Sequence, residues 1–264
     1  QDQWGAAYSA YVLAKQAGFD LEFQFSDQPI RKASAYLLPS VSGQAAISRR
    51  RWLELLERVR QGAILYVSHA DGLSAPLNQP LGLEIETRSR RSEPTSFTLS
   101  ESAQTFSLPA AVHLRIRLAG AEALGSEADG NPVFTRADYG QGSIYFLSLP
   151  LELILANQPG AFHAEGAQPY WQIYRCLAER MPQQRCAKKS NPFLGLTEHP
   201  NGADERILVL VNYSPREQTE PLTLAAGWQV DQVWHGDTPT PLAGAVSCRL
   251  PANDALVLTV RRQA

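Results

Sequence analysis

The chain has 264 residues, of which 44% are hydrophobic and 19% are charged, and its net charge is −2. This composition is typical of a folded protein with one large domain or two ordinary ones. A charge balance so close to neutrality gives no electrostatic attraction to nucleic acid or to an anionic membrane. No apolar run approaches the roughly 20 residues that span a bilayer.

The N-terminal residues predict a helix rather than a signal peptide. Trp4, Tyr8 and Tyr11 recur at helical spacing, and Gly18 supplies a C-terminal stop. A basic leader and a continuous apolar core, which a signal peptide needs, are both absent. Residues 20–25 alternate between apolar and polar side chains, which predicts a strand. Because the sequence does not begin with Met, we expect a processed chain or a piece of a longer one.

The number and spacing of the cysteines indicate in which cellular compartment the protein is expected. Cys176, Cys186 and Cys248 are odd in number, and their spacings match no zinc pattern. Reduced, structural thiols are the favoured interpretation, which favours a cytoplasmic protein. A Cys176–Cys186 bridge in an exported protein is the alternative.

Residues 35–72 predict a βαβ unit. Ser48 is the expected N-cap of a helix that ends at Gly62, and its apolar face carries Trp52 and Val59. The strand over 63–67 is continuously apolar, as expected of a parallel strand covered on both faces. We therefore predict a layered α/β domain over residues 1–182. Inside it, residues of about 73–118 lose helical periodicity and predict a β-rich insertion or sheet extension.

Glycine turns and a linker organise the rest of the chain. Asp129-Gly130 and Gly140-Gln141-Gly142 predict tight turns between strands. The second is not a dinucleotide-binding loop, since a strand follows it where that motif needs a helix. Residues 183–192 are polar and proline-flanked, which indicates a linker. Residues 193–264 carry short strands between turns and predict a small antiparallel β-sandwich.

Five polar residues lie just beyond predicted strands. Ser40, Ser68, His69, Asp71 and Glu152 are candidates for ligand or interface contacts, because ligands in open α/β sheets collect beyond the carboxyl ends of strands. Ordinary loop capping is the alternative for them. A hydrolytic triad of Ser68, His69 and Asp71 is disfavoured, because triads are assembled from separate segments and the nucleophile-elbow motif is missing.

Two tryptophans in the predicted sandwich are further candidates. Trp228 and Trp234 would stack on a sugar ring if exposed and would belong to the core if buried. The five histidines are scattered without metal-ligand spacing, so we predict no metal site and no cofactor.

Four segments, 35–72, 122–152, 207–224 and 250–260, together resemble the region after the catalytic barrel in glycoside hydrolases of the family-42 β-galactosidase type. The resemblance implies a flavodoxin-like domain of the class I glutamine amidotransferase type, used in trimer formation, and a closing β-sandwich. It also implies that the first strand of that domain is missing here. The barrel's two catalytic glutamates are absent, so no residue inherits their roles.

The function implied by the resemblance is that of a non-catalytic portion of a carbohydrate-active hydrolase. Its partners would be the catalytic barrel, further copies in a trimer and, through the parent enzyme, a carbohydrate substrate. The loops after Ser40, His69 and Glu152 would narrow the approach to the active site. A carbohydrate-binding module is one alternative. A self-standing amidotransferase-like enzyme with Ser68 as nucleophile is another, since none of the cysteines lies on a strand-to-helix turn.

Overall fold

The chain forms two compact units in the computed structural model. The first unit comprises residues 1–10 and 22–161, and the second comprises residues 11–21 and 162–264, so the boundary passes through helix α1 (Gln3–Ala17). No helix in the described part of the chain is both long enough and apolar enough to cross a membrane. The structure describes residues 3–25, 27–42, 47–70, 79–164, 166–181 and 185–263.

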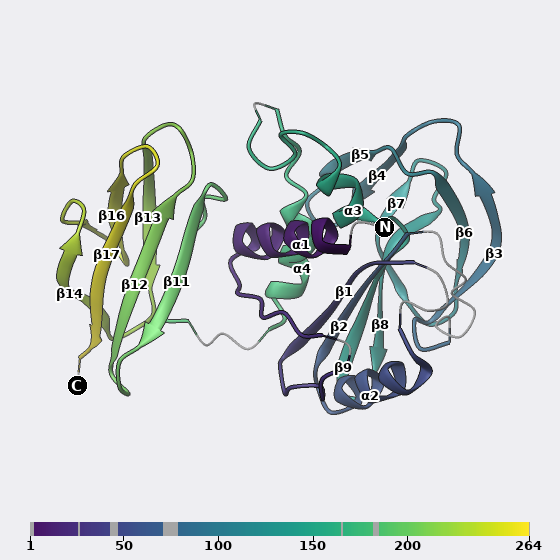
Figure 1. The fold of residues 1–264 in the computed structure, drawn as a ribbon, viewed down its shortest axis with the longest axis horizontal. Helices are drawn as coiled ribbons and strands as arrows, with labels where there is room; N and C mark the ends of the chain where they lie inside the picture. Colours follow the sequence, from purple (N-terminus) through teal and green to yellow (C-terminus); the bar gives the residue numbers. More distant parts are fainter. Residues whose placement is uncertain are drawn as a thin grey trace. The chain divides into compact units, whose positions relative to one another are not determined.

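A seven-stranded mixed sheet forms the centre of the first unit (Figure 1). The β1–β2 and β2–β9 pairs are parallel, and the remaining pairs are antiparallel. A separate antiparallel pair is formed by β3 (Leu83–Arg90) and β6 (Val112–Leu118). In spatial order the strands of the large sheet are β1 (Ala35–Val41), β2 (Ile64–His69), β9 (Gly142–Leu147), β8 (Pro132–Tyr139), β7 (Glu122–Glu127), β4 (Thr95–Leu99) and β5 (Thr105–Leu108).

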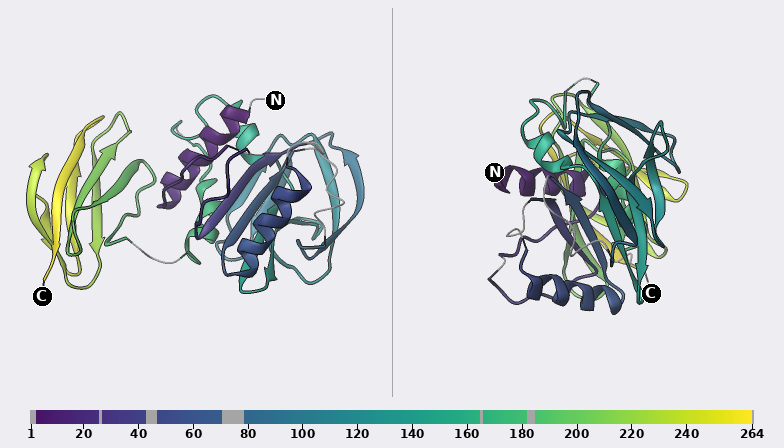
Figure 2. Two further views of the ribbon diagram at one scale, coloured as in Figure 1. Left: turned by 60° about the horizontal axis from the view of Figure 1, so that its bottom comes forward. Right: turned by 90° about the vertical axis from the view of Figure 1, so that its right-hand side faces the viewer.

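The predicted βαβ unit is confirmed. Helix α2 (Arg49–Arg60) begins at Ser48, whose hydroxyl accepts a hydrogen bond from the Arg51 amide at 3.2 Å. Its apolar face, which includes Trp52 and Val59, packs with buried residues of β2 and β9. Figure 2 shows α2 lying along the sheet beside these strands. Every residue of β2 is buried, because this strand has neighbours on both sides and covered faces.

The flavodoxin-like, amidotransferase-like layered α/β fold is wrong. The protein is mostly β, with 44% of residues in strands and 16% in helices, and its described residues contain four helices. The physical reason lies beyond β9, where the sheet continues through β8, β7, β4 and β5 in antiparallel order. Antiparallel neighbours are joined by short turns, whereas each parallel neighbour needs a crossover that usually carries a helix.

The turn predictions are confirmed, whereas the strand predicted near the N-terminus is not. The β8–β9 hairpin closes at the Tyr139–Gly142 pair, as the glycine pattern predicted, and Gly130 has the positive φ of +83° that its turn requires. The strand predicted over residues 20–25 is wrong. That segment follows α1 without joining any sheet, and residues 22–25 are exposed, so its alternating pattern has no core to face.

The second unit contains helix α4 (Trp171–Ala178) and two four-stranded antiparallel sheets. Buried residues of both sheets, among them Leu208, Leu222 and Leu258, form one apolar cluster, which is how two packed sheets share a core. One sheet has the order β10 (Ala187–Lys188), β13 (Gln218–Leu224), β16 (Ala245–Leu250) and β15 (Thr240–Leu242). The other has the order β11 (Leu194–Pro200), β12 (Glu205–Asn212), β17 (Ala255–Arg262) and β14 (Trp228–His235).

A glycine substitution tests how tightly α2 is held against the β8–β9 turn. A Cβ atom at Gly142 would collide with the backbone carbonyl oxygens of Ala63 and Val59. We expect Gly142→Ala to lower the free energy of unfolding by about 3 kcal/mol, as overpacking against backbone does. Gly130→Ala is the matched control: it meets no neighbouring atom, and its positive φ costs about 1 kcal/mol. If urea unfolding showed the same loss of unfolding free energy for both variants, the close packing of α2 against this turn would be contradicted.

Candidate functional site

Three of the predicted site residues meet in one hydrogen-bonded cluster. Glu152 lies at the start of the short helix α3 (Leu151–Ala156), which follows β9. Its carboxylate accepts from the Ser40 hydroxyl at 2.9 Å and from the Ser68 hydroxyl. It also accepts from the Tyr66 hydroxyl at 2.8 Å. One carboxylate therefore joins the ends of β1 and β2 to α3, and we call Ser40, Tyr66, Ser68 and Glu152 the Glu152 cluster.

Ser40 occupies a strained position in this cluster. Its φ is +50°, in the left-handed region that non-glycine residues rarely adopt. In this conformation its amide donates to the Ser68 hydroxyl at 2.6 Å. Its own hydroxyl accepts from the Leu153 amide at 3.0 Å while donating to Glu152. The backbone strain is offset by these three bonds, which fix the irregularity in the β1–β2 pairing between Leu38 and Val41.

His69 lies on the opposite face of β2 from Ser68 and the rest of the cluster. Successive residues of a strand point to opposite faces, and His69 directly follows Ser68 in the sequence. Its ring is buried and lies 6.2 Å from the Phe146 ring, within the apolar layer under α2. Asp71 lies outside the described residues. The strand period thus separates the serine and histidine that are adjacent in sequence.

Burial limits what the Glu152 cluster does chemically. Ser68 and Glu152 are both 0% exposed, so no substrate reaches either side chain from solvent. A buried carboxylate costs several kcal/mol unless hydrogen bonds replace its hydration, and here three hydroxyls do so. The Ser68 proton is already engaged with Glu152. The arrangement is suited to holding strand ends in place rather than to nucleophilic attack.

Tyr66 is the member of the cluster that the sequence reasoning missed. It precedes Ser68 by two residues on the same strand, and this spacing puts both side chains on one face. This two-residue spacing on a predicted strand could have identified Tyr66 from the sequence. Burial raises the pKa of Tyr66 well above its ordinary value, and the adjacent Glu152 charge raises it further. Tyr66 therefore stays protonated and acts as a hydrogen-bond donor.

Two of the three cysteines are poor nucleophiles. Cys176, Cys186 and Cys248 are all free thiols. Burial raises the pKa of Cys186 to about 12 and that of Cys248 to about 11, so neither is a thiolate near neutral pH. No group of three or more His, Cys, Asp or Glu side chains that could hold a metal ion occurs among the described residues.

The two candidate tryptophans of the second unit differ in environment. Trp228 is partly buried against the sandwich core, and the Arg206 guanidinium lies over its ring at 5.2 Å from the centroid. Trp234 is 62% exposed, and its indole N–H donates to the Thr259 hydroxyl at 2.8 Å. Trp228 is thus covered, whereas Trp234 presents a ring to solvent.

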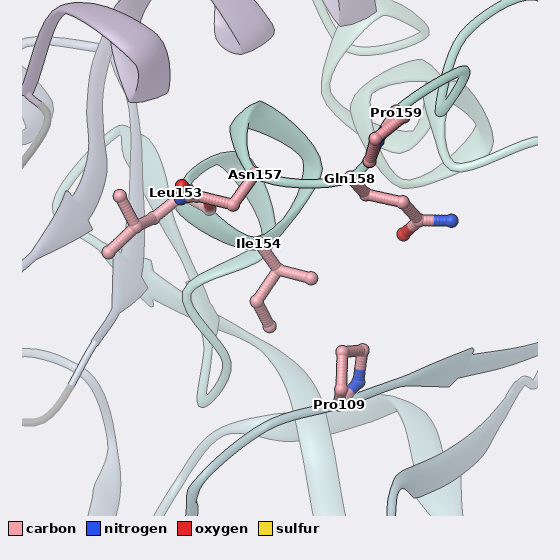
Figure 3. Close-up of a pocket in the computed structure, with 6 residues that line it drawn as sticks. All are labelled: Pro109, Leu153, Ile154, Asn157, Gln158 and Pro159. Carbon is pink, nitrogen blue, oxygen red and sulfur yellow. The ribbon is translucent and has the colours of Figure 1, made fainter.

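A hollow of about 430 Å³ lies beside α3 in the first unit (Figure 3). Ile154 and Pro109 face each other across it, and the amides of Asn157 and Gln158 are its polar side chains. Its described lining carries no titratable side chain, so it offers no acid–base chemistry. Glu152 lies on the same short helix but is buried in the Glu152 cluster.

No protein-family model and no curated protein matches this sequence, but solved structures do. A cold-adapted β-galactosidase from a Rahnella species matches 98% of this chain with a TM-score of 0.68 and 17% identity. A β-galactosidase from Bacillus circulans matches 100% of it (TM-score 0.63, 15% identity). An α-L-fucosidase from Paenibacillus thiaminolyticus matches 98% of it (TM-score 0.67, 13% identity).

At these identities the likeness is one of fold. The match occupies 36% of the Rahnella chain, 38% of the Bacillus chain and 45% of the fucosidase chain. The chain therefore spans less than half of the length of each of these solved structures.

Replacing Tyr66 by Phe tests the Glu152 cluster. The change removes one donor to a buried carboxylate, so we expect the free energy of unfolding to fall by about 2 kcal/mol at neutral pH. Tyr139→Phe is the control, because the Tyr139 hydroxyl meets the exposed side chain of Arg60 at 3.4 Å. We expect it to change stability by less than about 0.5 kcal/mol in the same urea titration.

The Tyr66 effect has a defined pH dependence. The folded-state pKa of Tyr66 is raised, so its contribution is fully present below the unfolded-state pKa of about 10. At higher pH the unfolded chain loses the phenolic proton and the folded chain keeps it, which lowers the stability of the unmodified protein. The stability gap between the unmodified protein and Tyr66→Phe should therefore narrow above about pH 10. A gap that widens there would contradict the buried, protonated phenol.

Proposed function

We propose that this chain is a non-catalytic region of a glycoside hydrolase-related protein. In this proposal it packs against a catalytic barrel and against neighbouring copies, and the segments after Ser40, His69 and the helix that carries Glu152 narrow the approach to the active site. The observation that carries the proposal is one of coverage. Nearly the whole chain matches only 36% of a β-galactosidase chain, with a TM-score of 0.68.

The chemistry of the Glu152 cluster supports the non-catalytic part of the proposal. Glycoside hydrolysis ordinarily needs two carboxyl groups about 5 to 10 Å apart across a sugar. Glu152 is fully buried and its oxygens are occupied by hydroxyl donors. The burial of Ser68 likewise argues against a self-standing enzyme that uses this serine as nucleophile.

Turnover assays test the absence of catalysis. We expect the purified 264-residue chain to release no nitrophenol from nitrophenyl β-galactoside or β-glucoside above the rate in buffer. A known β-galactosidase in the same buffer serves as the positive control. Turnover that disappears in Glu152→Gln and persists in Glu101→Gln, an exposed position, would contradict the proposal.

The encoding reading frame tests the place of this region in a larger protein. We expect a frame several hundred residues longer on the N-terminal side, with a barrel that carries two catalytic glutamates. A frame limited to these 264 residues would remove the barrel as a partner within one chain. Sedimentation equilibrium of the longer protein would then test the trimer that the family resemblance implies.

A further inference from the structure

We propose that the outer face of β14 and β17 in the second unit binds a saccharide, with Trp234 as the stacking platform. The proposed function assigns this region no ligand, so the inference goes beyond it. Trp234 is 62% exposed, although an indole ring this large is ordinarily mostly buried. Flat aromatic rings of this kind meet the apolar C–H face of a pyranose, while the sugar's hydroxyls reach polar neighbours.

Two β-bulges aim the relevant side chains. The pairing of β14 with β17 shifts register between Val230 and Gln232 and again between Val233 and His235. Asp231 and Trp234 are the extra residues at these two shifts. Bulges re-aim side chains and are frequent at functional sites. Here both residues contact side chains of β17: Asp231 meets Arg261 at 3.4 Å, and Trp234 meets Thr259.

The ring of Trp234 is held in one orientation before any ligand arrives. Its N–H donates to the Thr259 hydroxyl at 2.8 Å, and Thr259 is itself only 5% exposed. The bond anchors the edge of the indole to the sheet and leaves ring surface open to solvent. A fixed ring loses little side-chain entropy when a ligand stacks on it.

Planar polar groups lie on the same face of β17 as Thr259, the residue that bonds the indole of Trp234. Arg261 lies two residues from Thr259 on the same face of β17, about 7 Å along the strand. It pairs with Glu205 at 2.6 Å and with Asp231 at 3.4 Å, and its side chain is 57% exposed. Guanidinium and carboxylate groups offer paired donors and acceptors, which suit the adjacent hydroxyls of a sugar.

This combination favours a saccharide over a protein partner. The centre of a protein interface is depleted of charged residues. The exposed face of β14 and β17 instead carries the Asp231–Arg261 ion pair, whose side chains are 41% and 57% exposed. Trp228, the other tryptophan of β14, is covered by Arg206 and offers no comparable ring.

Calorimetric titration of the 264-residue chain with β-1,4-galactotetraose and with cellotetraose tests the site. We expect at least one tetrasaccharide to bind with a Kd of the order of 1 mM. Trp234→Ala should weaken that binding at least about tenfold, whereas Trp234→Tyr, which keeps a stacking ring, should stay within about threefold. Thr259→Val frees the indole and should cost about threefold, the size expected for reordering one side chain.

Two controls distinguish binding at Trp234 from effects of removing any exposed tryptophan and from unfolding. Trp4→Ala removes a ring that is 72% exposed in the first unit and should leave the affinity unchanged. Far-ultraviolet circular dichroism should be the same for all variants, because Trp234 lies outside the sandwich core. No heat with either sugar up to about 10 mM, or equal affinity in Trp234→Ala, overturns the proposal.

Sedimentation velocity provides the remaining outcome. A concentration-dependent dimer that Trp234→Ala abolishes would mean that this face binds a second copy. The contact would then include the half-buried Val209 and Val257 on the neighbouring strands. That result would overturn the saccharide assignment. Failure of sugar binding leaves the turnover result of the proposed function unaffected, so the two proposals fail separately.

Discussion

A buried carboxylate fixes the strand ends of the first unit. Glu152 is fully buried, and its burial is tolerated only because three hydroxyls from β1 and β2 donate hydrogen bonds to it. Each donor must therefore be held in place. This requirement accounts for the left-handed backbone of Ser40, which would otherwise be an unfavourable choice at a strand end.

The same constraint decides what this edge of the sheet does. In open α/β sheets the carboxyl ends of parallel strands are where ligands collect. Here the parallel pairs of the described residues are β1–β2 and β2–β9, and side chains near the ends of β1 and β2 bond to Glu152 at the start of α3. Ser40, Ser68 and Glu152, which suggested a ligand site, bond to one another and hold the strand ends in place.

In the second unit a backbone irregularity presents side chains to solvent, whereas the irregular backbone at Ser40 holds side chains in the interior. β14 is the edge strand of its sheet, and edge strands need protection from pairing with other chains. Its two bulges interrupt the regular ladder and so give that protection. They also turn Asp231 and Trp234 toward the side chains of β17, so one backbone feature serves both solubility and the proposed recognition of a sugar.

The sequence by itself determined the features that depend on near neighbours. Helix α2 with its Ser48 cap, the parallel β1–β2 pair and the glycine turns at 130 and 140 follow from patterns a few residues long. It also predicted Ser40, Ser68 and Glu152 beyond strand ends, whereas the structure places Ser40 within β1 and Ser68 within β2, and only Glu152 lies beyond a strand. Tyr66 was within reach of the same reasoning, since strand alternation puts it beside Ser68.

Only the tertiary structure decided the class of the fold and the meaning of the site. The β9–β8, β8–β7 and β4–β5 pairs join neighbouring segments through short turns, but the β4–β7 pair joins segments about 30 residues apart, such as Phe97 and Glu127, which no local pattern specifies. The burial of Glu152 and the exposure of Trp234 likewise depend on what packs around them. A local pattern fixes backbone conformation, whereas solvent access, and with it chemical role, is a property of the assembled chain.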